Sequence, residues 1–292
     1  MQQVREGCAE NPAQRGLATL RCSLSDARVS TEMNAKPEEH SDVTIGFRGV
    51  KYCAPYHNAT PILSDINLEI RRGETIVLLG RSGSGKTTLL KLVNRLLKPS
   101  AGEIFVNGHD AGSMDAIRLR RGIGYVIQEG GLFPHYTVAE NVALVPALEG
   151  WGRDRIAARV GEMMHLVGLE PGEYAGRRPS ELSGGQRQRV GVARALAADP
   201  EILLMDEPFG ALDPVTRAEL QNEFADLARR LAKTILFVTH DLREAMRVGT
   251  RIVLLAAGKI VADARPEKFL SVEHPEVRAF AASFAMPNEA RA

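Results

Sequence analysis

Two patterns of apolar residues recur along the chain, and they predict strands and helices in alternation. Residues 75–79 form a short, continuous apolar run that is typical of a strand buried on both faces. Leucine and valine side chains follow at helical spacing and predict a helix over residues 86–97. The chain therefore passes here from a buried strand through a short loop into a helix.

A different alternation, between single apolar and single polar positions, marks residues 43–47, 66–70 and 104–106. It predicts half-buried antiparallel strands, and Asn107-Gly108 is a turn signal that ends the last of them. Residues 1–40 are polar and lack a clear period, so we interpret them as a disordered N-terminal tail.

After a strand at 124–128, the pattern from about Thr137 to Leu196 is helical, and extended stretches then return. Helices are expected over 151–169, 186–196 and 214–232, and strands over 124–128, 202–205 and 234–238. Residues 252–255 and 259–261 flank Ala-Ala-Gly and predict a hairpin, after which one or two short helices are expected. Strands alternating with helices predict an α/β fold, with a mostly parallel sheet that is covered on both faces.

Composition narrows the class of protein. Hydrophobic residues at 44% and charged residues at 25% are ordinary for a globular protein, and no apolar run approaches the roughly 20 residues that span a bilayer. A formal net charge of +1 argues against a strong electrostatic grip on nucleic acid. Cys8, Cys22 and Cys53 have no metal-binding spacing, so free thiols in a reducing cytoplasm are expected.

The loop between the strand at 75–79 and the following helix has the spacing G-x-x-x-x-G-K-T of a phosphate-binding loop. Its glycines allow close backbone approach to a phosphate, and the helix N-terminus faces the anion. Lys86 is expected to reach the β- and γ-phosphates, and the Thr87 hydroxyl to bind Mg²⁺. The alternative is a glycine-rich turn without a ligand. The candidate nucleotide-binding residues are Gly80, Arg81, Ser82, Gly83, Ser84, Gly85, Lys86, Thr87 and Thr88.

Two carboxylates, Asp206 and Glu207, follow the apolar strand at 202–205. The carboxyl ends of strands are where an open α/β sheet presents its ligands. Asp206 suits the Mg²⁺ ion of the phosphate loop, and Glu207 suits polarisation of a water near the γ-phosphate. The alternative, a solvated strand end, loses weight because the phosphate loop is present.

A second candidate anion site begins at Ser183, in the stretch Leu-Ser-Gly-Gly-Gln at 182–186. Ser183 is a good helix N-cap, and two glycines allow close approach of an anion to the backbone. One loop already serves one nucleotide in this chain. The second surface makes sense if it serves the nucleotide of a neighbouring copy.

These stretches together resemble the ATP-binding subunits of ABC transporters, over about residues 43–270. The resemblance rests on 80–88, 182–186, Met205 to Pro208, Gln128 and His240. It implies a P-loop NTPase (RecA-like) core with an antiparallel β arm and an inserted α-helical subdomain at about 130–190. The implied ATP-binding domain spans 41–270, and 271–292 would form a short helical tail.

The resemblance also implies roles for individual residues. Lys86 and Thr87 would hold the phosphates of ATP and Mg²⁺, Asp206 would support the metal, and Glu207 would be the general base. Gln128 would contact Mg²⁺ or the attacking water and couple the site to a membrane partner.

Further implied roles concern the dimer. The γ-phosphate of the ATP bound to a second subunit would be contacted by Ser183, Gly184, Gly185 and Gln186. Asp213 resembles the D-loop aspartate, although Gly210 stands where many members have serine. His240 resembles the switch histidine at the γ-phosphate, and without the family a solvated residue would be the better interpretation. Tyr56, rather than Tyr52, fits the spacing of the adenine-stacking aromatic, and an ordinary loop aromatic is the alternative.

Residues 93–99, 124–135 and 144–146 resemble importers of glycine betaine, choline and related quaternary amines. This implies a homodimer or a paired ATPase subunit, transmembrane permease subunits, and indirectly a solute-binding protein. Residues 129–150 would form part of the groove for a permease helix, and the chain would lie at the cytoplasmic face of the inner membrane. The alternatives are an ABC ATPase for another solute or lipid, and a soluble ABC ATPase of translation or repair.

Overall fold

The structure is a computed structural model that describes residues 42–54, 61–128, 131–210 and 212–285. The chain divides into two units, residues 1–39 and 40–292, and the second is described here. The tail expected at 1–40 and the candidate aromatic Tyr56 lie outside the described residues.

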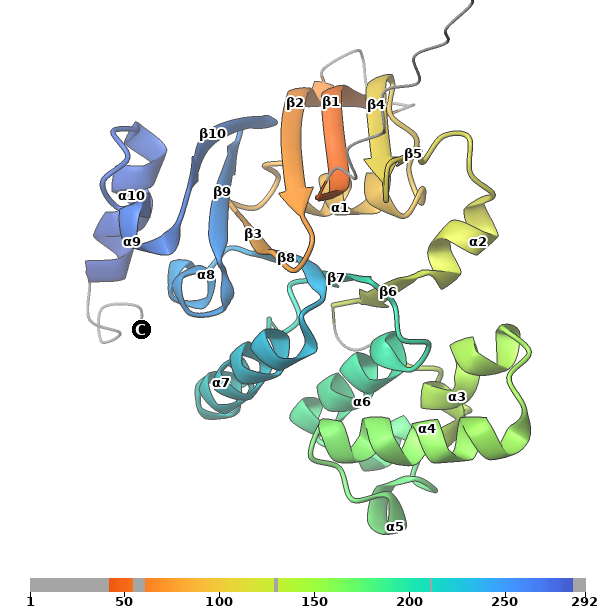
Figure 1. The fold of residues 1–292 in the computed structure, drawn as a ribbon. Coiled ribbons are helices and arrows are strands. Elements are labelled where there is room, and N and C mark those ends of the chain that lie inside the picture. The colour runs from red at the N-terminus through yellow and green to blue at the C-terminus, as the bar shows by residue number, and fades with distance from the viewer. Residues whose placement is uncertain (1–41, 55–60, 129–130, 211, 286–292) are drawn as a thin grey trace, which may run out of the picture. The chain divides into compact units, whose positions relative to one another are not determined.

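The described elements follow the alternation that the sequence predicts (Figure 1). The strands are β1 Val43–Cys53, β2 Pro61–Arg71, β3 Thr75–Leu79, β4 Ala101–Val106, β5 His109–Asp110, β6 Ile123–Val126, β7 Ile202–Asp206, β8 Thr234–Thr239, β9 Arg251–Ala256 and β10 Lys259–Ala264. The helices are α1 Lys86–Val93, α2 Ala116–Arg121, α3 Val138–Leu148, α4 Arg153–Leu166, α5 Pro171–Tyr174, the 3₁₀ turn η1 Pro179–Glu181, α6 Gly184–Leu196, α7 Pro214–Leu231, α8 Leu242–Val248, α9 Pro266–Phe269 and α10 Pro275–Ala285.

The larger sheet has the strand order β10-β9-β3-β8-β7-β6. Its strands from β9 to β6 pair in parallel, and β10 pairs antiparallel with β9 as the expected hairpin. A smaller antiparallel sheet has the order β2-β1-β4-β5 and contains the three alternating strands. The α/β class and the antiparallel arm predicted from the sequence are thereby confirmed.

Side chains of β3 alternate between two hydrophobic clusters, which places a packed layer on each face of the sheet. Val77 and Leu79 join the cluster that includes α6, α7 and α8. Ile76 and Leu78 join the cluster formed with α1 and the smaller sheet. Burial on both faces explains why β3 reads as a continuous apolar run rather than an alternating one.

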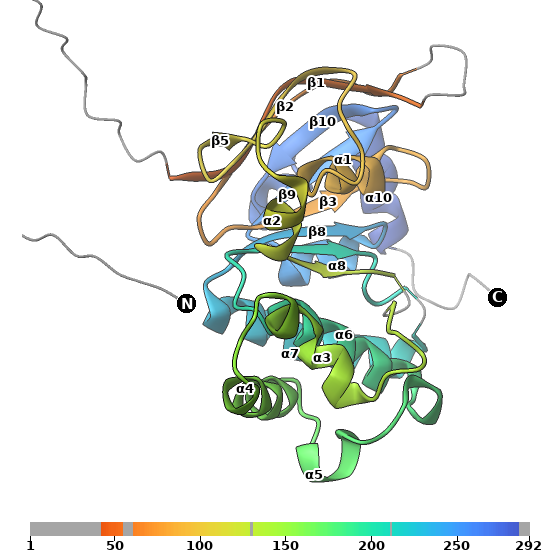
Figure 2. The same ribbon diagram turned by 90° about the vertical axis from the view of Figure 1, so that its right-hand side faces the viewer.

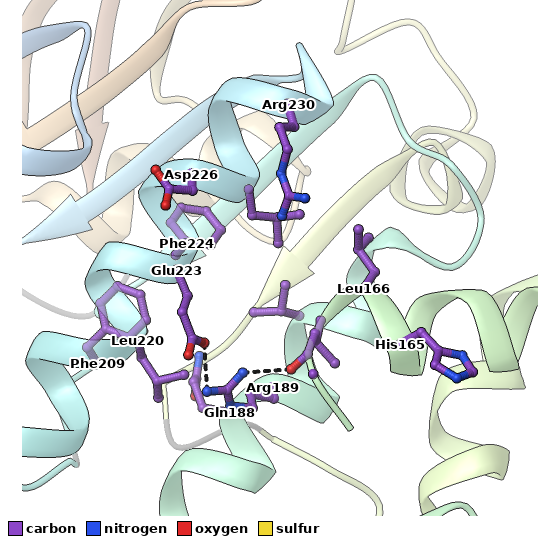
Figure 3. A pocket seen from close by; sticks show the side chains of 14 residues that line it. His165, Leu166, Gln188, Arg189, Phe209, Leu220, Glu223, Phe224, Asp226 and Arg230 are labelled. Atoms are coloured by element: carbon purple, nitrogen blue, oxygen red, sulfur yellow. Dashed lines mark hydrogen bonds and ion pairs between the residues drawn. The ribbon is translucent and has the colours of Figure 1, made fainter. Parts of the chain in front are cut away.

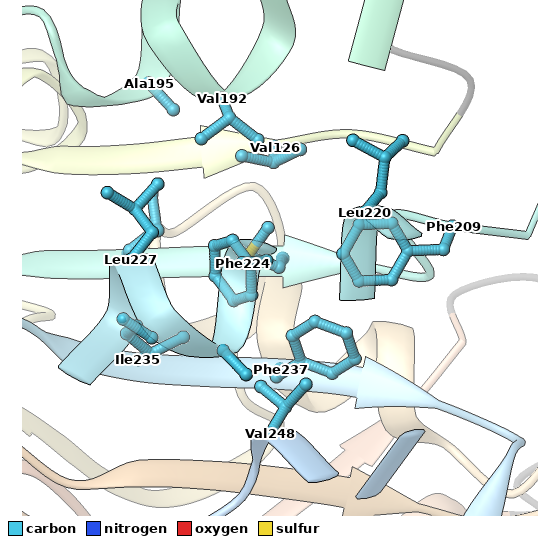
Figure 4. Packing of buried hydrophobic residues seen from close by; sticks show 14 of the residues in the cluster. Val126, Val192, Ala195, Phe209, Leu220, Phe224, Leu227, Ile235, Phe237 and Val248 are labelled. Atoms are coloured by element: carbon cyan, nitrogen blue, oxygen red, sulfur yellow. The ribbon is translucent and has the colours of Figure 1, made fainter. Parts of the chain in front are cut away.

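Three phenylalanines hold α7 against the sheet (Figure 4). The rings of Phe209, Phe224 and Phe237 have centroids 5.9 to 6.1 Å apart. Each ring is nearly fully buried, which is worth about 1.5 to 3 kcal/mol per side chain. Phe237 is on β8 and Phe224 on α7, so this contact fixes the helix over the strand that leads to His240.

Helices α3, α4 and α6 pack against one another in the stretch where the sequence predicts helices (Figure 2). Thr137 and Glu140 form a capping box at the start of α3. Among the described helices, none is both long and apolar enough to cross a bilayer.

Several predicted boundaries were wrong. The helix expected over 86–97 ends at Val93, because Arg95 adopts a positive φ and the Asn94 side chain accepts the Leu96 N–H. The helix expected over 151–169 is α4, which ends at Leu166 shortly before Gly168 at φ +70°. The strand expected over 124–128 ends at Val126, so Gln128 lies in the turn beyond β6.

Candidate phosphate-binding and catalytic site

The loop between β3 and α1 is tightly curled, and glycine is required where its backbone approaches other elements. A Cβ at Gly80 would lie 2.5 Å from the Leu255 carbonyl oxygen and 2.6 Å from Ser84 Oγ. Gly85 is the N-cap of α1 at φ 103°, and a Cβ there would meet the Leu63 side chain at 2.6 Å. Larger residues at either position would have to displace the loop.

Lys86 folds back over the loop that precedes it. Its Nζ donates to the carbonyl oxygens of Gly80, at 2.8 Å, and Arg81, at 2.9 Å. Burial lowers the pKa of Lys86, while the negative charges of Glu207 and Asp206 act in the opposite direction. The ammonium group is thus held within the loop, close to two carboxylates.

Ser84 supplies a donor that has no partner in the described part of the chain. Its side chain is 6% exposed, and its Oγ forms no hydrogen bond there. A buried hydroxyl without a partner is costly, and a phosphate oxygen would satisfy it. This feature favours a loop that holds an anion over a turn that binds nothing.

Asp206 at the end of β7 is joined to the phosphate loop through Thr87. The Thr87 hydroxyl donates to Asp206 Oδ1 at 2.7 Å. Burial raises the pKa of Asp206, and the hydrogen bond from Thr87 and the charges of Lys91 and Lys86 oppose that rise. Burial and the charge of Asp206 together raise the pKa of Tyr125 on β6 to about 12.

One hydroxyl and one carboxylate fit a Mg²⁺ ion that is completed by phosphate oxygens and water. Mg²⁺ is usually bound through one or two carboxylates and substrate phosphates rather than by an all-protein cage. Within the described ranges, no group of three or more His, Cys, Asp or Glu residues is placed to hold a metal by itself. Thr87 and Asp206 are therefore suited to a metal that arrives with its nucleotide.

Glu207 and His240 meet at the ends of two adjacent strands, β7 and β8. His240 Nδ1 lies 3.2 Å from Glu207 Oε2. Glu207 has a φ of 44°, and its N–H donates to the Val238 carbonyl at 3.0 Å. A left-handed backbone costs a non-glycine residue about 1 to 2 kcal/mol, so local contacts hold this carboxylate in place against strain.

Gln128 lies near the same carboxylate. The position of a Cβ on Gly210 is 3.8 Å from Glu207 Oε2 and 3.9 Å from Gln128 Nε2. Gly210 thus leaves space between the two side chains. The structure brings Gln128, Glu207 and His240 together, as the sequence predicts for residues of one site.

The Ser183 stretch is built as a capped helix start. Ser183 Oγ accepts the Gln186 N–H at 3.2 Å, and Gln186 Oε1 accepts the Ser183 N–H at 2.9 Å. A Cβ on Gly185 would lie 2.8 Å from the Thr216 side chain, so glycine allows α6 to approach α7. In the described part of the chain, no hydrogen bond or ion pair joins 183–186 to 80–88.

Asp213 has a structural role within the chain as the N-cap of α7. Its carboxylate accepts the N–H groups of Val215 and Thr216, both at 3.1 Å. Hydrogen bonds lower the pKa of Asp213, and those from Thr216 have the largest effect. The carboxylate is therefore held charged at an exposed helix start.

A buried polar cluster behind the site was missed by the sequence analysis. Gln221 Nε2 donates to Glu244 Oε1 at 2.7 Å, and Arg217 Nη2 donates to the Leu212 carbonyl at 2.9 Å. Burial raises the pKa of Glu244, and hydrogen bonds from Thr239 and Gln221 oppose it. One signal was available, because Gln221 shares a helical face with Ala225 and Ala228.

A hollow of about 280 Å³ lies beside the site, between α2, β6, α3 and α6. Large apolar side chains at its wall are exposed, with Ile127 at 40% and Phe133 at 42%. The family resemblance predicts that 129–150 forms part of a permease groove, and Phe133, Leu144 and Val145 from that range line this hollow.

The chain is similar in sequence and in fold to proteins of one family. The family model described as ABC transporter matches residues 63–210. Two solved structures, a dimeric bacterial ABC transporter cassette and a dimeric post-hydrolysis cassette bound to ADP and Pi, are 35% and 33% identical to this chain. Each covers 76% of this chain and 98% of its own, with a TM-score of 0.68.

Similar curated proteins include the osmoprotectant import ATP-binding protein OsmV of Salmonella typhimurium, 51% identical over 72% of this chain and 55% of its own length. The choline transport ATP-binding protein OpuBA of Bacillus subtilis is 52% identical over 74% of this chain and 56% of its own length. The glycine betaine uptake system ATP-binding protein YehX of Escherichia coli is 51% identical over 73% of this chain and 69% of its own length.

The chain spans about half the length of the first two of these relatives and more than two thirds of the third. The family match covers the phosphate loop, the Ser183 stretch and both carboxylates of the site described above. The chain therefore belongs to the ABC transporter family and has the fold of its ATP-binding cassettes.

Proposed function

We propose that this chain is the ATP-binding and ATP-hydrolysing subunit of an importer for glycine betaine, choline and similar osmoprotectants. One observation carries the enzymatic part. The phosphate loop is joined to Asp206 through Thr87, while Glu207 and His240 stand together on the adjacent strand ends. Phosphoryl transfer needs this combination of anion binding, metal support and a positioned base.

Binding of the nucleotide is assigned to the loop at 80–88. Its N–H groups, the Ser84 hydroxyl and the Lys86 ammonium would contact the phosphates. Lys86 would exchange its present carbonyl acceptors for phosphate oxygens. When bound, Mg²⁺ supplies positive charge that neutralises the β- and γ-phosphate oxygens, and Thr87 and Asp206 are its proposed protein ligands.

Hydrolysis is assigned to Glu207 as the base that accepts a proton from the attacking water at its carboxylate. His240 contacts that carboxylate and would position it while contacting the γ-phosphate. Gln128, whose amide lies across the space left by Gly210 from the Glu207 carboxylate, would orient the water or contact the metal. Tyr56 remains our candidate for the ring that stacks on adenine.

Two subunits would complete each site. In one subunit no hydrogen bond or ion pair links the described residues 183–186 to the phosphate loop. The open start of α6 would therefore contact the nucleotide of a second subunit through Ser183, Gly184, Gly185 and Gln186, with Asp213 nearby. The dimeric forms of the two similar cassettes support this arrangement.

The membrane partner is proposed to be a separate permease, with a solute-binding protein supplying its substrate. The hollow beside Ile127 and Phe133 is the proposed seat for a permease helix, because exposed apolar groups there need cover. The subunit would then lie at the cytoplasmic face of the membrane. Differential affinity for ATP between an open and a closed pair of subunits would drive the permease.

The proposed solutes follow from the relatives, whose names include osmoprotectant import, choline transport and glycine betaine uptake. The test is to co-purify the subunit with its permease, reconstitute both in vesicles, and measure uptake of labelled glycine betaine and choline after osmotic upshift. ATP-dependent uptake that is lost in Glu207→Gln supports the proposal. ATP hydrolysis by the complex without uptake of any quaternary amine would contradict the solute, and would favour an ABC ATPase for another solute or lipid.

A further inference from the structure

A cavity of about 400 Å³ lies away from the nucleotide site, between the end of α4, α6 and α7 (Figure 3). Its volume falls within the range of small-molecule sites, which are about 300 to 1,000 Å³. Leu166 lines it from α4, Val192 from α6, and Leu220 and Phe224 from α7. An occupant therefore needs an apolar body.

The polar groups at its wall are mostly paired. Arg189 binds Glu223 at 2.6 Å and donates to the Val167 carbonyl at 2.7 Å. Asp226 lines the cavity and is paired with Arg229, which does not line it. Both acidic side chains that line the cavity are thus already matched with arginines on the protein.

Two donors at the same wall are not matched. Gln188 is 4% exposed, and its amide nitrogen has no hydrogen-bond partner in the described chain. Arg230 forms no ion pair or hydrogen bond with any described residue, and its side chain is labelled among those lining the cavity in Figure 3. The cavity therefore has an excess of donors, including one cationic group.

We propose that this cavity is a binding site for a small amphipathic carboxylate. The apolar body lies against Val192, Leu220 and Phe224, and the carboxylate pairs with Arg230 at the mouth. A second acceptor on such a ligand would satisfy the Gln188 amide, which is otherwise costly to leave unpaired. A cationic amphiphile is disfavoured because it would meet Arg230 without a free carboxylate to balance it.

Such a ligand would touch two helices whose first turns belong to the proposed dimer site. Helix α6 begins after Ser183 and α7 after Asp213. Occupancy would bridge these helices beside the Arg189–Glu223 pair and restrain their relative movement. This consequence rests on the proposed function, whereas binding itself is measured without ATP hydrolysis.

The test uses the full chain, with 8-anilinonaphthalene-1-sulfonate as a fluorescent apolar anion, and displacement by octanoate, octanol and octylammonium. Octanoate should displace the probe better than octanol, and octylammonium should displace it least. Arg230→Gln should weaken octanoate by about fivefold, the value of a partly exposed ion pair, and leave octanol unchanged. Arg153→Gln is the matched control, because it removes the same charge from an exposed position at the start of α4 that does not line the cavity, and it should change octanoate affinity less than twofold.

A second variant tests the apolar body. Leu166→Trp fills the cavity from its partly exposed edge and should abolish displacement by both octanoate and octanol while the thermal unfolding midpoint is kept. Equal octanoate affinity in wild type and Arg230→Gln would overturn the proposal. Equal losses in Arg153→Gln and Arg230→Gln would also overturn it, as would probe release by Mg-ADP but not by octanoate.

Discussion

The imidazole of His240 lies against the carboxylate of Glu207, with Nδ1 3.2 Å from Oε2. Glu207 is at the end of β7 and His240 follows β8, so two parallel neighbours deliver the pair to one edge of the sheet. The contact is an ion pair only while the imidazole carries a second proton. In either state it restricts where the Glu207 carboxylate points, and this gives the proposed base a fixed position.

Replacing Glu207 by glutamine should stop hydrolysis without preventing nucleotide binding. The amide cannot accept a proton from water, whereas the phosphate loop and Asp206 remain. Loss of a general base lowers turnover by about 100-fold or more. ATP hydrolysis, ATP affinity and subunit mass in the presence of ATP are the measurements, and an ATP-bound dimer should accumulate.

Glu219→Gln on the exposed side of α7 is the control, because it removes the same charge away from the site. It should retain wild-type turnover. Hydrolysis by Glu207→Gln at the wild-type rate would show that another group is the base.

Lys86→Ala should weaken ATP binding rather than turnover alone. The variant loses a charged donor that is positioned inside the loop by the carbonyls of Gly80 and Arg81. Hydrogen bonds to charged groups contribute about 1.5 to 3 kcal/mol, so Kd for ATP should rise by roughly 10- to 100-fold. Calorimetric titration checks this, with the exposed Lys98→Ala as control, and an unchanged Kd in Lys86→Ala would contradict the assignment.

Mixing two inactive variants tests whether sites are shared between subunits. Ser183→Asp keeps a good N-cap for α6 but places negative charge where the partner's phosphate would lie. In a head-to-tail dimer of one Ser183→Asp subunit and one Lys86→Ala subunit, one of the two sites is intact. It combines the normal phosphate loop of the Ser183→Asp subunit with the normal Ser183 of the Lys86→Ala subunit. A 1:1 mixture should recover roughly a quarter of wild-type hydrolysis, because half of the dimers are mixed and carry one intact site.

Each variant alone should remain inactive, which makes the recovery specific to the mixed dimer. No recovery on mixing, with both variants folded and able to associate, would show that each site is completed within one subunit.

Much of the site followed from sequence because its parts depend on local chemistry. Each of these features can be recognised within a few neighbouring residues. Gly80 and Gly85 mark places where the backbone has no room for a side chain, and the two acids mark the end of the apolar strand β7. The Gln221–Glu244 contact is different, because it joins residues on separate helices, 23 positions apart, that meet only after α7 and α8 pack. The end of α1 was missed for a different reason, because the local bond between the Asn94 side chain and the Leu96 N–H and the positive φ of Arg95 ended the helix although apolar spacing continued.

The buried acid Glu244 should make the stability of the protein depend on pH in a definite direction. Burial raises its pKa in the folded state above the usual value of 4.5, so the folded protein binds this proton more tightly than the unfolded chain. The free energy of unfolding therefore falls as pH rises from that value through the folded-state pKa, and it is recovered on acidification through the same interval.

Glu244→Gln should remove this dependence, because glutamine stays neutral and keeps an oxygen for the Gln221 amide. The difference in thermal unfolding midpoint, variant minus wild type, should increase as pH is raised through that interval and then level off. Glu219→Gln, which changes an exposed carboxylate, should show no such increase. A midpoint difference between Glu244→Gln and wild type that is constant across the pH series would mean that Glu244 is ionised to the same extent in the folded and unfolded states.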